Sequence, residues 1–149
     1  MQNNRYKIIR TKDPNIIKFI LPYIEKTIQK AREDYSIESF LKWFRISINN
    51  PLVGTWVVIK KGNKLLDGDS RPIAYAIATI NSNLVEEYVN ITHLYSEDKS
   101  ATRKLFNVIE NWAKENGITK IGGLTKRNPE AWKKAYGFEV LYFNLIKEI

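Results

Sequence analysis

The spacing of apolar residues changes along the chain, and each change marks an element. Residues 6–10, with Tyr6, Ile8 and Ile9 among charged residues, are predicted to form a first short strand. Asp13 and Pro14 follow as a helix N-cap and a proline at the first helical position. Apolar residues then recur at helical spacing over 16–28, and we expect Pro22 to kink or split this helix.

A second helix is predicted from Ser36, a residue type that caps helix N-termini. Its end is marked by the turn residues 49–51. One apolar face runs along it, formed by Ile37, Phe40, Leu41, Phe44 and Ile48.

Three strands are predicted in the middle of the chain. Residues 53–60 and 72–80 are rich in β-branched and aromatic side chains, and turn residues separate them, so they should pair antiparallel. Residues 87–95 form the next strand. Its alternation places Val89, Ile91, His93 and Tyr95 on one face, and Tyr88, Asn90, Thr92 and Leu94 on the other.

The most regular helical pattern follows, capped by Asp98 or Ser100 and ended by Gly117. Its apolar stripe consists of Ala101, Leu105, Val108, Ile109 and Trp112.

The C-terminal part alternates strand, helix and strand. Residues 118–125 form a strand, and a short helix begins after Asn128 and ends at Gly137. The last strand is residues 138–146.

Composition limits the classes of protein that fit. The 149 residues fit one domain, 1–149, with 44% hydrophobic and 27% charged residues. No stretch is apolar enough to cross a membrane, and the N-terminus does not look like a secretory signal, so we expect a cytoplasmic protein without a membrane partner. With no Cys and one His we expect no metal cofactor. The net charge of +8 favours an anionic partner without identifying it.

This order of elements resembles the GNAT superfamily of N-acetyltransferases. Two stretches carry the resemblance: residues 91–114, from Ile-Thr-His-Leu-Tyr to Glu-Asn-Trp-Ala-Lys, and residues 128–139, with Asn-Pro-Glu-Ala-Trp and Tyr-Gly-Phe-Glu. The resemblance implies an α/β fold of three layers, α/β/α. Its central sheet would be mixed, mostly antiparallel, with six to seven strands and about four helices.

The resemblance also implies acetyl-CoA as co-substrate. The family holds the pyrophosphate on a loop of pattern Gln/Arg-x-x-Gly-x-Gly/Ala, whose backbone N–H groups reach the phosphates. Here that pattern is degraded: Glu97 stands at the first position, and the loop is short. The alternative interpretation is an ordinary capped helix start. The residues that the resemblance assigns to the cofactor are Leu94, Tyr95, Ser96, Lys99, Ser100, Ala101, Thr102, Arg103, Asn128 and Trp132.

The catalytic residues are less clearly marked. Where many family members carry a tyrosine acid, this chain has Lys133, and Tyr136 beside Gly137 is the substitute candidate. The candidate bases are Glu86, Glu87 and His93. Core packing of Tyr136 and a structural hydrogen-bonding role for His93 are the alternatives.

The first functional hypothesis is therefore an acyl-CoA-dependent N-acyltransferase. It would move an acetyl group to a primary amine of a small molecule or protein by direct attack in a ternary complex. The second is a GNAT-fold protein that is inactive and serves as a binding or interaction module. Nucleic-acid binding ranks last because the chain lacks a recognised motif for it. A homodimer fits the family.

Overall fold

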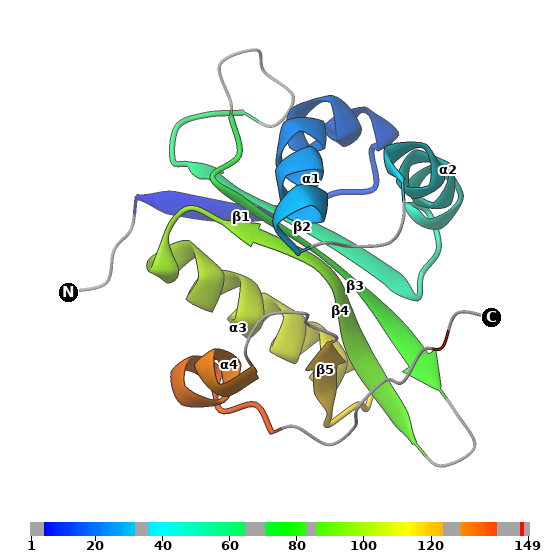
Figure 1. The fold of residues 1–149 in the computed structure, drawn as a ribbon. Coiled ribbons are helices and arrows are strands. Elements are labelled where there is room, and N and C mark those ends of the chain that lie inside the picture. The colour runs from blue at the N-terminus through cyan, green and yellow to red at the C-terminus, as the bar shows by residue number, and fades with distance from the viewer. Residues whose placement is uncertain are drawn as a thin grey trace.

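The computed structural model describes residues 5–31, 36–64, 71–82, 86–123, 129–139 and 147. Within them the chain forms one five-stranded sheet covered by helices on both faces (Figure 1). The strands are β1 (Tyr6–Arg10), β2 (Val53–Lys60), β3 (Ala74–Ser82), β4 (Glu87–Ser96) and β5 (Ile121–Gly123). The helices are α1 (Ile17–Ala31), α2 (Ile37–Ser47), α3 (Lys99–Glu115) and α4 (Pro129–Tyr136), with a 3₁₀ turn, Pro14–Ile16, before α1.

The sheet is mixed, as predicted. Its strands lie in sequence order, β1 to β5; the first four pair antiparallel, and β5 pairs parallel to β4. The three-layer α/β/α prediction and its four helices are confirmed for the described residues. The predicted last strand, residues 138–146, falls mostly outside the described ranges, which accounts for the smaller strand count.

Helices α1 and α2 cover one face of the sheet (Figure 1). Both begin as the sequence indicates: Asp13 Oδ1 accepts from Asn15 N, and Ser36 Oγ accepts from Ser39 N. Of the expected kink or split at Pro22, the split is wrong, because α1 continues through this residue. Proline removes one backbone donor, and burial of the helix's apolar face against the sheet offsets that loss. That core contains Ile16, Ile20, Tyr23, Ile24, Phe40, Phe44, Ile48, Val57, Tyr75 and Ile77.

The opposite face is covered by α3, with α4 on the same side (Figure 1). The predicted stripe of α3 is buried there, together with Trp56 and the alanines of β3. Gly137, at φ +75°, takes the left-handed conformation that ends α4, as predicted. Tyr136 and Phe138 pack against this core.

Strand β4 contains a β-bulge at Thr92. Ile91 pairs with Ala78 and His93 with Ile77, so Thr92 is an extra residue without an opposite partner. Its Oγ1 donates to the Ile77 carbonyl at 2.8 Å. The extra residue reverses the pleat. Val89 and Ile91 pack on the α3 side, whereas His93 and Tyr95 pack with the rings of the α1–α2 side.

The predicted single face of Val89, Ile91, His93 and Tyr95 is therefore wrong. Strand side chains alternate faces with a period of two, and one inserted residue moves every later side chain to the other face. The prediction assumed an unbroken alternation through residues 87–95, although neither of the two predicted faces was purely apolar.

Candidate functional site

The candidate site begins where β4 leaves β5. Among the described residues, which break off after Gly123 and resume at Pro129, the two strands pair at Val89, Asn90 and Ile91, and Ile91 directly precedes the bulge. Within the described ranges, no strand pairs with His93–Ser96 on the side opposite β3. The second half of β4 thus presents a backbone edge, which is the kind of surface that binds an extended ligand as an added strand. It includes Leu94, Tyr95 and Ser96, the residues assigned from sequence to the cofactor.

The start of α3 lies at the end of this edge, and two of its backbone donors bond to the Asp98 side chain. The Asp98 carboxylate, through Oδ1, accepts from Ser100 N at 2.7 Å and from Ala101 N at 3.3 Å. These amides are among the N-terminal groups that have no partner inside a helix. Of the two predicted caps, Asp98 is the one that forms. The structure thus supports the interpretation of an ordinary capped helix start.

Side chains from three elements form hydrogen bonds with Asp98. Tyr6 of β1 donates its hydroxyl to Oδ2 at 3.3 Å. Ser96 at the end of β4 donates its hydroxyl to the Asp98 carbonyl at 2.7 Å and accepts from Asp98 N at 3.3 Å. Thr102 of α3 also donates its hydroxyl to that carbonyl, at 3.1 Å. Only Glu97 and Asp98 separate β4 from α3, so no loop extends beyond the helix start.

The residues predicted to hold a pyrophosphate at α3 fall into two groups. Lys99 and Arg103 are exposed, and Ser100 is partly exposed. Ala101 and Thr102 are buried, at 0% and 8% exposure, so their side chains face the core. The exposed cations can attract an anion, while the backbone amides of Ser100 and Ala101 are already bonded.

An aromatic and charged cluster lies beside the same end of β4, and no sequence pattern indicated it. Tyr95 stacks on Tyr23 of α1, with ring centroids 4.6 Å apart. Arg71 lies over the Tyr23 ring at 5.6 Å and forms an ion pair with Glu97. Tyr95 donates its hydroxyl to Glu97 at 3.3 Å. Burial, and then the Glu97 carboxylate, raise the pKa of the Tyr95 phenol.

His93 lies directly after the bulge and is 7% exposed. Its ring packs edge-on against Phe40 of α2, with centroids 4.7 Å apart. Burial among apolar groups disfavours the charged imidazolium and lowers the pKa of His93 to about 4. The ring is therefore neutral at pH 7.

The other two candidate bases lie at the far end of β4. Glu87 is its first residue, about 13 Å along the strand from Ile91, where the pairing with β5 ends. Glu86 forms an ion pair with Lys120. Of the three, only His93 is placed at the open half of the strand.

The C-terminal candidates are described in part. The centroid of the Phe106 ring of α3 lies 4.6 Å from that of Tyr136 and 5.7 Å from that of Phe138. This is the core packing that sequence analysis kept as an alternative, and it leaves a hydroxyl role untested. Asn128 and the side chain of Trp132 lie outside the described residues.

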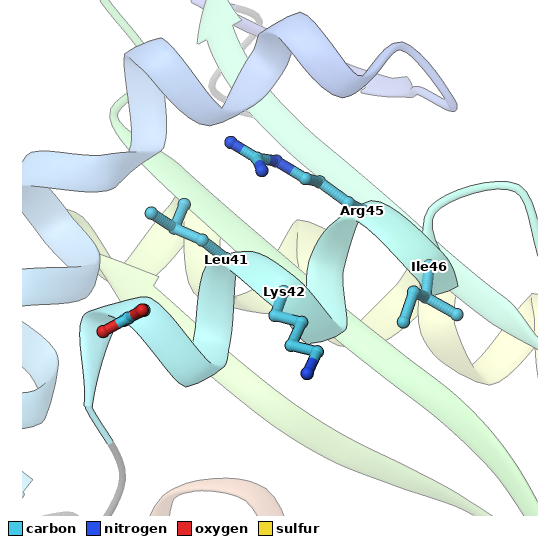
Figure 2. A pocket seen from close by; sticks show the side chains of 5 residues that line it. Leu41, Lys42, Arg45 and Ile46 are labelled. Atoms are coloured by element: carbon cyan, nitrogen blue, oxygen red, sulfur yellow. The ribbon is translucent and has the colours of Figure 1, made fainter.

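The surface of the described residues carries two hollows, one beside the end of β4 and one on α2. One, of about 450 Å³, is lined by both signs of charge and borders the start of α3; its walls include Tyr6, Lys60, Arg71, Glu97 and Asp98. The other, of about 470 Å³, lies on α2, where Leu41 and Arg45 leave one side of the helix and Lys42 and Ile46 another (Figure 2). In the described part of the chain, no helix has both the length and the apolar character needed to cross a bilayer.

Neither protein-family models nor curated proteins match the chain. Solved structures do match it. A predicted acetyltransferase from Clostridium acetobutylicum, with acetyl-CoA, is 17% identical, with a TM-score of 0.73 over 95% of this chain and 96% of that one. A possible acetyltransferase from Clostridium difficile 630 is 13% identical, with a TM-score of 0.71 over 97% and 98%.

An aminoglycoside N-acetyltransferase in complex with CoA is 10% identical, with a TM-score of 0.67 over 96% of this chain and 94% of that one. The chain therefore has the fold of the GNAT acetyltransferases, as the sequence pattern predicted. At such identities the likeness concerns the fold, and activity has to be argued from the site.

Proposed function

We propose that this protein is an acyl-CoA-dependent N-acyltransferase that moves an acetyl group to a primary amine of a small molecule or protein. The observation that carries the proposal is the bulge at Thr92: it turns the second half of β4, where no strand among the described residues pairs with His93–Ser96 on the side opposite β3. Similar folds solved with acetyl-CoA and with CoA support it.

The pantetheine part of the donor fits this edge. Pantetheine is a chain with two amides, and the backbone N–H and C=O groups of an unpaired strand can bond to it as they would to another strand. Leu94, Tyr95 and Ser96 would hold it. The diphosphate part fits less well, because Asp98 occupies the α3 amides.

The chemistry is direct transfer: the amine nitrogen bonds to the thioester carbonyl carbon, the C–S bond breaks, and the departing thiolate takes a proton. An alkylammonium has a pKa of about 10.4, and a ring with a pKa of about 4 is too weak a base to remove that proton efficiently. We therefore propose that the acceptor attacks as the free amine, after its ammonium form has lost a proton to the bulk buffer, and we assign no base role to His93. The Tyr136 hydroxyl is the candidate proton donor.

Calorimetric titration with acetyl-CoA tests the binding step. We expect one-to-one binding with a submillimolar Kd that survives moderate salt, since backbone bonds along an edge depend less on ionic strength than phosphate contacts do. Absence of binding at millimolar acetyl-CoA would overturn the proposal.

Tyr136→Phe tests the acid once an amine acceptor has been found by screening. The ring stays to pack on Phe106, so stability should hold while kcat falls about 100-fold. Tyr88→Phe, on β4 before the bulge, is the matched control and should leave kcat unchanged. An equal effect of both substitutions would refute a catalytic role for Tyr136.

The second candidate is a GNAT-fold binding module without transfer activity. The observation that favours it is the occupied α3 start. Donor binding without acetylation of any amine in a broad screen would support this candidate over the first.

A further inference from the structure

We infer that Asp98 is a specificity-determining residue that holds its carboxylate in the position a donor phosphate would take. The protein would then select acyl thioesters by their pantetheine arm and gain little from the diphosphate. This inference rests on the proposed function and narrows its donor class to pantetheine thioesters.

The first support is the chemistry of the helix start. A helix N-terminus attracts an anion through its unpaired N–H groups and its positive dipole end. Here the anion is part of the chain: Asp98 Oδ1 bonds to Ser100 N and Ala101 N. A diphosphate would have to displace this carboxylate or approach it as a like charge.

The second support is that Asp98 is fixed by groups outside its own helix. Tyr6 reaches its Oδ2 from β1, and the Ser96 hydroxyl bonds to its backbone from the end of β4. Displacing the carboxylate would break the Tyr6 contact as well as the two helix bonds. With only Glu97 and Asp98 between β4 and α3, the chain has no spare length to form a separate phosphate loop.

The third support is the charge beside it. Glu97 adds a second carboxylate at the same junction, paired with Arg71 and bonded by Tyr95. The exposed Lys99 and Arg103 offset this charge at long range, but side-chain cations do not replace the backbone amides that Asp98 covers.

The test compares S-acetyl-pantetheine with acetyl-CoA by calorimetric titration of the full chain. For the wild type we expect the two Kd values to agree within about threefold. Asp98→Asn keeps a capping side chain and removes the charge, while Asp98→Gly uncovers the amides; Gly is tolerated at N-caps, so both variants should fold. We expect Asp98→Gly to bind acetyl-CoA at least tenfold tighter and Asp98→Asn to change in the same direction. Binding of S-acetyl-pantetheine should stay unchanged.

Asp13→Gly is the matched control, since Asp13 caps the 3₁₀ turn before α1 and should leave the ratio of the two Kd values unchanged. A wild-type preference for acetyl-CoA above 100-fold would overturn the inference and leave the proposed function intact. Unchanged acetyl-CoA affinity in both Asp98 variants would also overturn it. Failure of both ligands to bind any variant would overturn the inference and the proposed function together.

Discussion

The two ends of the candidate site differ in whether their backbone hydrogen-bonding groups have partners among the described residues. Along His93–Ser96, the bulge at Thr92 leaves one side of β4 without a partner strand among the described residues. At the start of α3, a few residues later, Asp98 covers two amides that a helix ordinarily leaves open. A fold shared with acetyltransferases can thus keep the edge that suits pantetheine and close the end that suits phosphate.

Under the proposed function, this difference means that one donor molecule would be recognised in parts. Backbone edges bind by hydrogen bonds that do not depend on side-chain identity, so they persist when a sequence diverges. A helix start is sensitive to one residue, because a single acidic side chain both satisfies its amides and reverses the local charge. The edge and the helix start can therefore be tested separately.

Deletion of Thr92 should have the largest effect. Without it Ile91 and His93 become consecutive opposite Ala78 and Ile77, which gives a regular ladder with every side chain on its present face. We expect the variant to fold, as judged by circular dichroism, and to lose detectable acetyl-CoA binding in calorimetry, because the bulge that shapes the second half of β4 is removed.

The control for the deletion is Thr92→Val, which keeps the extra residue and removes the hydroxyl that bonds to the Ile77 carbonyl. It should lose about 1 kcal/mol of stability and bind within about threefold of the wild type. Binding retained after the deletion would show that the bulge does not create the donor site.

His93 provides a pH test of the open half of β4. Its pKa is about 6.5 unfolded and about 4 folded, so the unfolded chain binds the proton first as pH falls. Above pH 6.5 His93 is neutral in both states and does not change the free energy of unfolding. Between pH 6.5 and 4 only the unfolded chain takes up the proton, so the free energy of unfolding falls, by up to about 3 kcal/mol. Urea unfolding from pH 7 to 4.5 measures it.

In His93→Gln this position does not titrate, so the free energy of unfolding should fall less steeply over the same pH range. The carboxylates are the same in both proteins and contribute equally to the two slopes. Equal slopes for the two proteins would show that folding does not lower the pKa of His93.

Removal of the α3 cap should have a moderate effect on stability. Asp98→Ala leaves Ser100 N and Ala101 N without an acceptor, and N-cap losses of this kind cost about 1 kcal/mol in urea unfolding. Asp98→Ser should retain most of that stability through its hydroxyl. If Ala and Ser variants are equally stable, the cap does not stabilise α3.

The smallest effect is expected at Arg71. Its side chain is 66% exposed, and exposed ion pairs contribute at most about 1 kcal/mol, so Arg71→Gln should change unfolding stability by less than about 0.5 kcal/mol. Glu97→Gln is the reciprocal variant and should behave alike. A loss above 2 kcal/mol would show that the Tyr23–Tyr95 cluster depends on this pair.

Much of the fold follows from local patterns. The bounds of β1 and β2 agree with the prediction, and the stripe of α3 is buried as expected. The expected split at Pro22 did not occur. Proline removes one backbone hydrogen bond of the helix, which is a local loss, whereas the packing that offsets it comes from the sheet. The site was harder to predict, because its shape depends on how β3 and β4 pair and on which groups surround Asp98.

The sequence by itself determined where strands and helices form, since side-chain periods of two and about 3.6 and the capping residues Asp13, Ser36 and Asp98 act over a few residues. Only the tertiary structure decided that Thr92 is an extra residue in β4 and that Tyr6 holds the Asp98 carboxylate from a strand 92 positions away. A bulge is a property of two paired strands. The closing of a helix start depends on its neighbours in space, and neither is encoded in a local period.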